Sequence, residues 1–360
     1  VRYFRDDDVW KPGPVQRLRI ERHNQRAIAS ALAAAQPDVV AVWHVGAFSL
    51  GVVTAVIEAG VPIVYAVGDD WPSYCTVLDQ WVPLVERLGR AARWLRPLVG
   101  VPTVVPDLGA SGPFCFNSAS NRERNERYSR WAFPHPSIVY SGFDRSLFNA
   151  GERGAGTARP WRWRLLYAGR FDPRKGIETL VRAMPLLPSE ATLEIRGTGD
   201  DAERDRLQAL AAELGVGERV RFSRGPQAEL VGMYRAADGV GFPSGWEGAF
   251  GLVPLEAMSC GTVVVGTGTG GSGEFLLHER NCLRYPAGHP DALAAALCRL
   301  ADDEALRDRL RKAGETTAAF FDVERLTDAL EAWYVAAAAG YPEGDPPSRQ
   351  FELDGEADHG

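Results

Sequence analysis

Short apolar runs alternate with amphipathic segments along most of the chain. From residue 163 onward, β-branched and apolar runs such as "WRLLYAG", "ATLEIRG" and "TVVVGT" predict strands. Between them, segments such as "DAERDRLQALAAELG" and "DALAAALCRL" predict helices, since apolar residues recur at helical spacing, as at Leu293, Leu297 and Leu300. This alternation predicts a parallel, doubly wound sheet with helices on both faces.

The first 150 residues show a sparser form of the same alternation. A helix is expected over residues 15–35, with Ile28 and Leu32 on one face, and strands follow in "DVVAVWHV", "VPIVYAVGDD", "PFCFNS" and "SIVYSGF". We therefore predict two α/β domains, one over residues 1–150 and one over residues 161–340 that includes the C-terminal helices. The Gly-rich residues 151–160 are predicted as a linker, and the polar, acidic residues 341–360 as a disordered tail.

Composition and charge narrow the classes of function. A chain of 360 residues with 45% apolar content supports two cores, and a net charge of −7 argues against a nucleic-acid partner. The five cysteines are odd in number and form no CxxC pair, which argues against a disulfide framework and a zinc site. No apolar run has the length of a membrane span, and "VRYFRDDDVW" lacks the apolar block of a signal peptide. We therefore expect a soluble, cytoplasmic protein.

Charged and glycine-rich segments follow several predicted strands of the second domain. "YAGRFDPRKG" places Arg170 after a strand and Lys175 before the next helix, where two cations suit a diphosphate; ordinary surface charge is the alternative. Gly197 in "RGTGD", and Gly270 and Gly271 in "GTGTGGSGEF", occupy similar positions, with ordinary turns as the alternative. A helix is expected to follow them in "GEFLLHER".

Two carboxylates flank an apolar loop in "WEGAFGLVPLEAMSCG". Pro254 suits the first turn of a helix and Gly261 its end. Glu256 lies one turn into that helix and offers acceptors for both hydroxyls of a ribose. Glu247, on the preceding loop, is placed to bind a sugar beyond the diphosphate. For Glu256, a solvated helix face is the alternative.

The second half resembles the nucleotide-sugar domain of the retaining GT-B glycosyltransferases known as the group 1 or GT4 family. The resemblance rests on "AGRFDPRKGIETLVRAM", "GTGD", "RVRFSRGP", "MYRAADGVGFPSGWEGAFGLVPLEAMSCGTVVVGTGTGGSGEFL" and "NCLRYPAGHPDALAAALCRLADD". It implies a GT-B fold of two Rossmann-like domains facing a cleft. It also implies metal-independent transfer of a sugar, with retention, from a UDP- or GDP-linked donor to an acceptor hydroxyl. The donor contacts carried over to this sequence are Gly169, Arg170, Lys175, Gly197, Phe250, Gly251, Leu252, Glu256, Gly270 and Gly271.

Three departures from the family pattern bear on the function. The family places its sugar-binding glutamate at position 248, which is Gly248 here, so either Glu247 substitutes in a remodelled loop or the donor sugar lacks that contact. Gly68 stands where the family has a histidine that touches the donor sugar. The first strand and glycine-rich loop of the family are missing before "PDVVAVWH", which predicts a truncated N-terminal domain. A catalytically impaired or fragmentary nucleotide-sugar-binding protein is therefore the alternative.

The first domain adds candidates for acceptor binding. His44 and Asp69 follow neighbouring strands and are placed to position an acceptor hydroxyl; the alternatives are a half-buried polar contact for His44 and a helix N-cap for Asp69. The run from Asp6 to Asp8 follows no apolar strand and is not predicted to bind metal. An NAD-dependent oxidoreductase is not expected, because no GxGxxG opens a helix with an acid about twenty residues later.

Two arginine-rich segments with aromatic residues remain, "LVERLGRAARWLRPLV" and "NRERNERYSRWAF". Solvated helix faces explain them simply, and some relatives use such faces for peripheral contact with anionic membranes. The expected partners are a nucleotide-sugar donor and a small-molecule, lipid or glycan acceptor.

Overall fold

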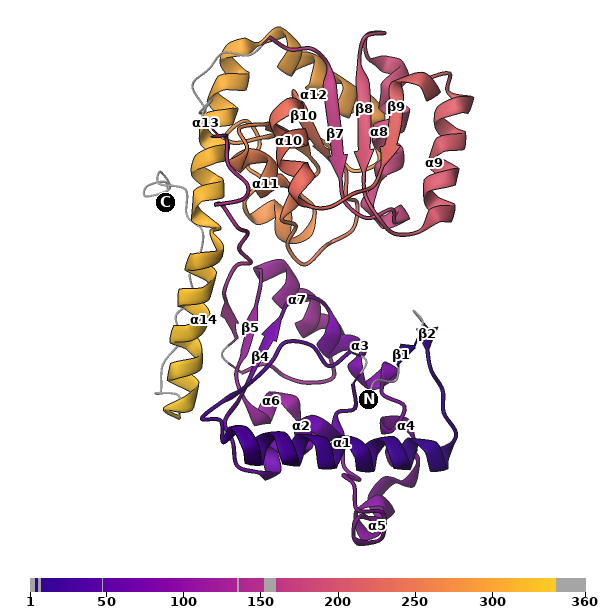
Figure 1. Ribbon diagram of the computed structural model, residues 1–360, viewed down its shortest axis with the longest axis vertical. Coiled ribbons are helices and arrows are strands. Elements are labelled where there is room, and N and C mark those ends of the chain that lie inside the picture. The colour runs from indigo at the N-terminus through magenta and orange to yellow at the C-terminus, as the bar shows by residue number, and fades with distance from the viewer. Residues whose placement is uncertain (1–3, 6–7, 47, 135, 152–159, 341–360) are drawn as a thin grey trace. The chain divides into compact units, whose positions relative to one another are not determined.

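The computed structural model describes residues 4–5, 8–46, 48–134, 136–151 and 160–340. Asp6, Asp7, the predicted tail and all but the ends of the predicted linker lie outside the described residues. The chain divides into two compact units (Figure 1). Unit 1 runs to Val139 and resumes at Asp328, and unit 2 is Tyr140–Thr327.

Unit 1 is built on a four-stranded parallel sheet in the order β3-β4-β5-β6. The strands are β3 (Val40–Val42), β4 (Ile63–Val67), β5 (Phe114–Phe116) and β6 (Ser137–Ile138). In the register, Ala41 lies opposite Val64 and Ala66 opposite Cys115. Tyr65 stacks on Phe114 at a centroid distance of 4.4 Å in the core of this unit.

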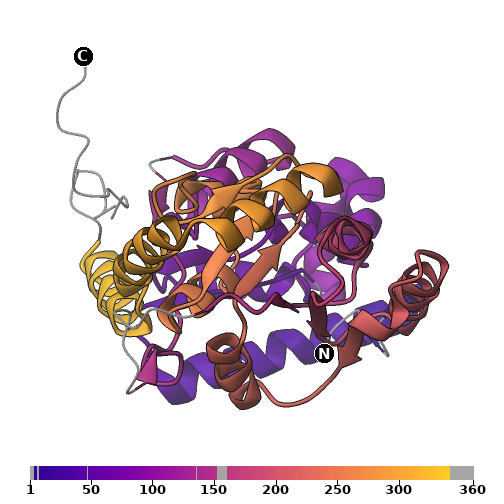
Figure 2. The same cartoon turned by 90° about the horizontal axis from the view of Figure 1, so that it is seen from above.

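Eight helical segments surround this sheet within the described residues. The predicted first helix is confirmed as α1 (Pro14–Ala35), the long indigo helix in the view from above (Figure 2), with Pro14 in its first turn. The others are α2 (Gly51–Glu58), α3 (Trp71–Leu78), α4 (Val82–Leu88), η1 (Gly89–Ala91), α5 (Ala92–Val99), α6 (Leu108–Ser111) and α7 (Ala119–Tyr128). A short antiparallel pair, β1 (Phe4–Arg5) with β2 (Asp8–Val9), precedes α1.

Unit 2 contains the predicted parallel, doubly wound sheet. Its strand order is β12-β11-β10-β7-β8-β9 and every pair is parallel. The strands are β7 (Arg164–Ala168), β8 (Thr192–Arg196), β9 (Val220–Ser223), β10 (Gly239–Phe242), β11 (Val263–Gly266) and β12 (Leu283–Arg284).

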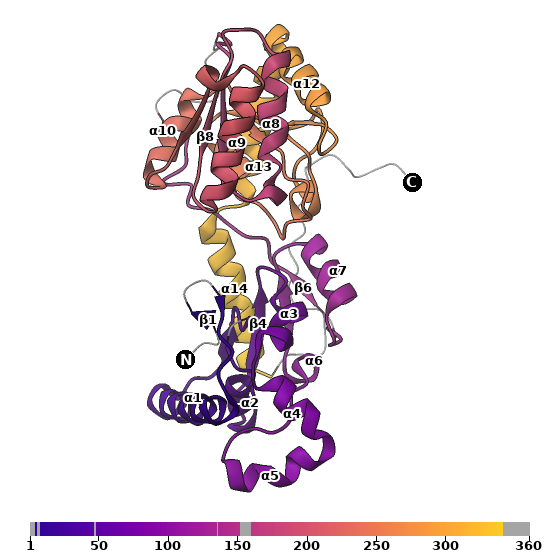
Figure 3. The ribbon, with the colours of Figure 1, turned by 90° about the vertical axis from the view of Figure 1, so that its right-hand side faces the viewer.

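Helices cover both faces of this sheet and produce two apolar cores. One core joins the sheet to α8 (Ile177–Ala183), α9 (Asp201–Glu213) and α12 (Pro290–Asp302). The other involves α10 (Ala228–Ala236) and α11 (Val253–Ser259), and α13 (Glu304–Phe320) contributes to both (Figures 1 and 3). Short 3-10 turns complete the unit: η3 (Pro173–Lys175), η4 (Met184–Leu186), η5 (Gly217–Arg219) and η6 (Gly270–Glu274).

The boundaries of the units fall at different residues from those of the expected domains. Phe143 and Phe148, placed in the first domain by the sequence analysis, belong to a core of unit 2. The last helix, α14 (Val323–Ala338), is divided, and its residues from Asp328 onward belong to unit 1. No helix in the described chain is long and apolar enough to span a bilayer.

The prediction of a helix in "GEFLLHER" is wrong. A 3-10 turn, η6, ends at Glu274, and His278 then forms a parallel bridge with Cys282. The Asn281 side chain accepts from the Leu277 N–H at 2.9 Å and donates to the Phe275 carbonyl at 2.7 Å. These backbone groups are thus satisfied without a helical ladder, which the nearby glycines would also disfavour.

Candidate functional site

The sheet of unit 2 has a topological switch point between β7 and β10. From β7 the chain proceeds through β8 to β9 on one side, and β10, β11 and β12 lie on the other. In an open α/β sheet, the crevice at the carboxyl ends of the two strands at such a point is the usual ligand site. The segments carrying the predicted donor contacts follow β7, β8, β10 and β11 and therefore share this edge.

Close backbone contacts hold these segments together. A Cβ on Gly197 would lie 1.9 Å from the Gly169 carbonyl oxygen, so the segments after β7 and β8 touch only because residue 197 is glycine. The Gly271 N–H donates to the Gly248 carbonyl at 2.9 Å, which joins the segment after β11 to the loop before α11. The structure thus brings the predicted glycines and the Glu247 loop to one edge.

Arg174, which the sequence analysis did not select, is already neutralised at this edge. Its guanidinium donates to both oxygens of Asp172, with the shortest contact at 2.6 Å, and lies 5.2 Å from the centre of the Trp246 ring. The hydrogen bond from Arg174 lowers the pKa of Asp172 to about 2. Spacing along "RFDPRKG" alone does not show which of its cations is paired in this way.

No hydrogen bond or ion pair joins Arg170 or Lys175 to a carboxylate among the described residues, and the charge of the nearby Asp172, which is paired with Arg174, still acts on both. Arg170 is exposed, and its carbonyl accepts a 3.1 Å hydrogen bond from the Tyr167 hydroxyl. Burial lowers the pKa of Lys175, and the charge of Arg170 lowers it further. Two cations that repel one another, one exposed and one partly buried, favour an anionic ligand close to both.

Glu256 is a buried carboxylate rather than a member of a solvated helix face. It lies on α11, which has Pro254 in its first turn, and only 6% of the residue is exposed. The Tyr234 hydroxyl donates to its Oε2 at 2.9 Å. Burial raises the pKa of Glu256, and the hydrogen bond from Tyr234 opposes that rise. Tyr234, on α10, therefore contacts a predicted site residue, and the sequence analysis did not select it.

The other residues of the predicted loop differ in character. Phe250 is buried in an aromatic cluster with Phe275 and Phe321. Its side chain therefore belongs to the core, and only its backbone is left to contact a ligand. Gly251 has a φ of 107°, which favours glycine, and Leu252 is the N-cap residue of α11. Glu247 is exposed, and no hydrogen bond or ion pair joins it to another described residue.

In unit 1, His44 and Asp69 lie together at the carboxyl ends of β3 and β4. His44 Nε2 is 3.5 Å from Asp69 Oδ2, and both contact the hydroxyl of Tyr74, which the sequence analysis did not select. Asp69 Oδ1 also accepts from the Trp71 N–H at 3.0 Å at the start of α3, but the N-cap residue of that helix is Asp70.

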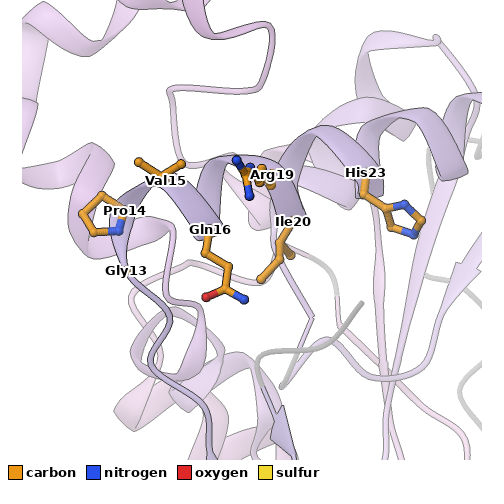
Figure 4. A pocket seen from close by; sticks show the side chains of 7 residues that line it. All are labelled: Gly13, Pro14, Val15, Gln16, Arg19, Ile20 and His23. Carbon is orange, nitrogen blue, oxygen red and sulfur yellow. The ribbon is translucent and has the colours of Figure 1, made fainter.

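Two hollows lie away from these sheet edges. One, of about 640 Å³, follows the first turns of α1, and Figure 4 shows Gln16, Ile20 and His23 on the same side of that helix. The other, of about 470 Å³, lies in unit 2 near the amino ends of β7 and β8 and includes Met233 of α10. The described residues contain no cluster of three or more metal-ligating side chains, and all five cysteines are free.

The model of the family glycosyl transferases group 1 matches residues 153–317. This match covers the segments at the switch point. Unit 2 matches the group 1 glycosyltransferases. The residues matched include every predicted donor contact.

Individual relatives agree with the group 1 match. The chain is 36% identical over 213 residues to the D-inositol 3-phosphate glycosyltransferase of Corynebacterium jeikeium (strain K411), covering 55% of this chain and 51% of that protein. The chain spans about half the length of the curated relatives it matches.

Solved structures extend the likeness to both units. HepE of Anabaena in complex with UDP has a TM-score of 0.66 at 20% identity, over 86% of this chain and 82% of that one. Sucrose-phosphate synthase of Thermosynechococcus elongatus has a TM-score of 0.66 at 22% identity, over 91% and 80%. The fold, two parallel-sheet α/β units, is therefore of the GT-B type, as predicted.

Proposed function

We propose that this protein is a glycosyltransferase that moves a sugar from a nucleoside diphosphate sugar to an acceptor hydroxyl. The observation that carries the proposal is the pair of cations, Arg170 and Lys175, neither in an ion pair within the described residues, at the switch point of a unit that matches the group 1 family. The donor is UDP- or GDP-linked, and the solved HepE complex with UDP supports the first.

Each residue of the edge has a role in this proposal. Arg170 and Lys175 stabilise the diphosphate as negative charge develops on it in the transition state. The backbone N–H groups near Gly251 and Leu252 and the turns at Gly169, Gly197, Gly270 and Gly271 contact phosphate and sugar. Glu256 accepts hydrogen bonds from the ribose hydroxyls, and Glu247 contacts the transferred sugar.

Two finer statements rest on the family resemblance. The transfer retains the anomeric configuration, and it proceeds without a metal because Arg170 and Lys175 supply the positive charge. His44 and Asp69 of unit 1 position the acceptor.

Nucleotide binding to the purified chain tests the donor site. UDP or GDP should raise the melting temperature, and the double variant Arg170→Ala/Lys175→Ala should abolish the shift. Arg182→Ala is the matched control, since this arginine lies on the following helix, α8, and is paired with Glu178. A shift that survives the double substitution, or one that Arg182→Ala abolishes equally, would refute the assigned diphosphate site.

A nucleotide-sugar-binding protein without transferase activity is the second candidate function. It is favoured by Gly248 and Gly68, which replace two sugar contacts of the family. Slow hydrolysis of a sugar nucleotide from a panel of UDP- and GDP-sugars distinguishes the two. Hydrolysis that disappears in the Arg170→Ala/Lys175→Ala variant supports the enzyme, and saturable binding without hydrolysis of any donor supports the binding protein.

We further propose that α5 makes peripheral contact with a membrane at its cytoplasmic side. Trp94 and Leu98, one helical turn apart, are 82% and 76% exposed, and Arg93 is exposed beside them. The helix projects from the body of unit 1 in both side views (Figures 1 and 3). An exposed apolar pair next to cations suits an anionic lipid surface.

Vesicle co-sedimentation tests this contact. The protein should bind vesicles that contain phosphatidylglycerol better than vesicles of phosphatidylcholine alone, and Trp94→Ser/Leu98→Ser should reduce the binding. Val15→Ser, at a 67% exposed valine on α1, is the control. Binding that is unchanged in the α5 variant would contradict the proposal.

A further inference from the structure

The carboxyl ends of β3 and β4 carry a hydrogen-bonded cluster of His44, Asp69 and Tyr74, here called the acceptor cluster. The Tyr74 hydroxyl donates to Asp69 Oδ2 at 2.8 Å and lies 3.0 Å from His44 Nε2. His44 and Asp69 remain about half exposed, at 46% and 48% of their side chains. The cluster is therefore both organised and open to a ligand.

The local backbone fixes the direction of the hydrogen bonds in the acceptor cluster. The Gly46 N–H donates to His44 Nδ1 at 3.2 Å, so a neutral His44 carries its proton on Nε2. Nε2–H then donates to the Tyr74 oxygen, and the Tyr74 hydroxyl donates to Asp69. A Cβ at residue 46 would lie 2.5 Å from Tyr74 Cε2 and 2.6 Å from His44 Cε1. Glycine at this position lets the two rings meet.

Three asparagines on and just before α7 hold the turn that presents Asp69. Asn117 donates to the Gly68 carbonyl at 3.2 Å, Asn121 to the Val67 carbonyl at 3.0 Å, and Asn125 to the Asp69 carbonyl at 3.3 Å. Asn121 and Asn125 are fully buried, and Asn125 also donates to Asn121 Oδ1 at 2.9 Å. Buried polar networks of this kind give a group a defined position.

The exposed charge of the acceptor cluster is negative. Burial alone would raise the pKa of Asp69, but the nearby His44 ring and the hydrogen bonds from Tyr74 and the Trp71 N–H outweigh burial and lower the pKa, so Asp69 is ionised at neutral pH. Arg124 of α7 forms an ion pair with the adjacent Asp70 and has 9% of its side chain exposed. His44 is the only basic side chain in contact with Asp69 among the described residues.

We propose that the acceptor cluster binds neighbouring hydroxyl groups of an uncharged polyol, with Asp69 as the hydrogen-bond acceptor and Tyr74 as the residue that positions Asp69 and His44. A carboxylate accepts from two hydroxyl donors, whereas a phosphate group at the same place meets a like charge. This inference rests on the proposed function, since it gives that transferase an acceptor without a phosphate at the cluster. It separates this chain from relatives named for D-inositol 3-phosphate.

Ligand-observed saturation-transfer NMR on the full chain tests the inference with two matched pairs of probes. These are myo-inositol with myo-inositol 3-phosphate, and methyl α-D-glucopyranoside with its 6-phosphate. At least one uncharged probe should bind, and several-fold more tightly than its phosphorylated counterpart. Tyr74→Phe should weaken that binding several-fold. Asp69→Asn should weaken it too and remove the discrimination against phosphate, a change that a purely structural role of Asp69 would not produce.

Two control variants fit the same unit. Tyr128→Phe alters an exposed tyrosine on α7, and Asp38→Asn alters an aspartate before β3, at the opposite edge of the sheet. Neither should change probe binding. Variants are compared only where their melting temperature matches that of the parent, and Asp69→Ser is the substitute if Asp69→Asn fails to fold.

Three results would overturn the inference: no binding of either uncharged probe, equal or tighter binding of the phosphorylated probes, or unchanged binding in both Tyr74→Phe and Asp69→Asn. The UDP-induced melting shift of unit 2, measured on the same samples, separates this outcome from failure of the proposed function. A UDP shift without polyol binding ends the inference alone. Polyol binding without a shift from UDP or GDP leaves the cluster in place and refutes the donor site.

Discussion

The Tyr234 hydroxyl donates a 2.9 Å hydrogen bond to Glu256 Oε2, and this buried contact joins α10 to α11. Tyr234 is fully buried and Glu256 nearly so. A carboxylate in such a position needs donors, because desolvation disfavours its charged form. The same contact leaves Glu256 oriented before any nucleotide binds.

Tyr234→Phe should therefore destabilise the protein and weaken nucleotide binding. Loss of a hydrogen bond to a charged group costs about 1.5–3 kcal/mol, and the pKa of Glu256 should rise further because the tyrosine opposes the effect of burial. Thermal melting and UDP titration measure the two effects. Tyr285→Phe is the matched control, since the buried Tyr285 hydroxyl has no hydrogen-bond partner among the described residues. Equal losses in both variants would assign the effect to packing alone.

The lowered pKa of Lys175 predicts a pH dependence of UDP binding. Burial and the charge of Arg170 favour its neutral form, so affinity should fall as pH rises through a pKa below the usual value of 10.5. A bound diphosphate favours the protonated form and should take up a proton over that range. Lys175→Arg should flatten the profile, because arginine keeps its charge throughout. A wild-type profile that is flat up to pH 10.5 would show that Lys175 does not meet the phosphate.

The contact between Gly197 and Gly169 predicts a steric effect at the same edge. Gly197→Ala places a methyl group 1.9 Å from the Gly169 carbonyl oxygen, so the segments after β7 and β8 must separate. Overpacking of this kind costs about 1–3 kcal/mol. Melting temperature and UDP affinity should both fall. Gly232→Ala, on α10 with open space around it, should instead be neutral or stabilising.

The sequence allowed prediction of the fold because strand and helix periods are local signals. β10 and β11 are buried along nearly their whole length, and α12 shows Leu293, Leu297 and Leu300 on one buried face. Glycine-rich turns after successive strands then place Arg170, Lys175 and Glu256 at one edge, since parallel strands end on the same side.

The remaining features depend on side-chain contacts that the spacing of residues along the sequence does not predict. Asp172 pairs with Arg174 and not with Lys175, and side-chain geometry within this one turn decides between the two. Tyr74 reaches His44 across 30 positions of sequence, and Tyr234 reaches Glu256 across 22. The helix expected after Gly271 fails for a similar reason, because Asn281 binds the backbone of that segment from beyond its end.

The position of Glu247 in the loop before α11 predicts that a carboxylate lost at residue 247 can be restored at residue 248. Glu247→Gln should reduce turnover of the sugar nucleotide much more than the affinity for UDP, because the carboxylate contacts only the sugar in the proposed function. A Cβ at residue 248 would meet its nearest atom, the Trp246 carbonyl oxygen, at 3.9 Å, so the backbone accepts a side chain there without a clash at Cβ. Adding Gly248→Glu to Glu247→Gln should therefore recover turnover. Equal kinetics in wild type and Glu247→Gln would remove Glu247 from the site.

Asp79 of unit 1 couples the stability of two helices to pH. Its carboxylate accepts from the Leu50 N–H at 2.8 Å at the start of α2, and from the Trp81 N–H at 2.7 Å at the start of α4. Burial raises the pKa of Asp79 to about 6, and these backbone hydrogen bonds only partly offset the rise. The folded state thus binds the proton of Asp79 more tightly than the unfolded chain does.

Stability should accordingly be lost as pH rises from about 4 through 6, because the unfolded carboxyl ionises first. A shift of about two pKa units corresponds to about 3 kcal/mol. Asp79→Asn removes this titration, so the stability of the variant relative to wild type should improve by about that amount between pH 4 and 7. Hydrogen exchange of peptides covering α2 and α4 measures opening of unit 1 alone. Parallel pH profiles for the two proteins would show that Asp79 ionises as easily in the fold as outside it.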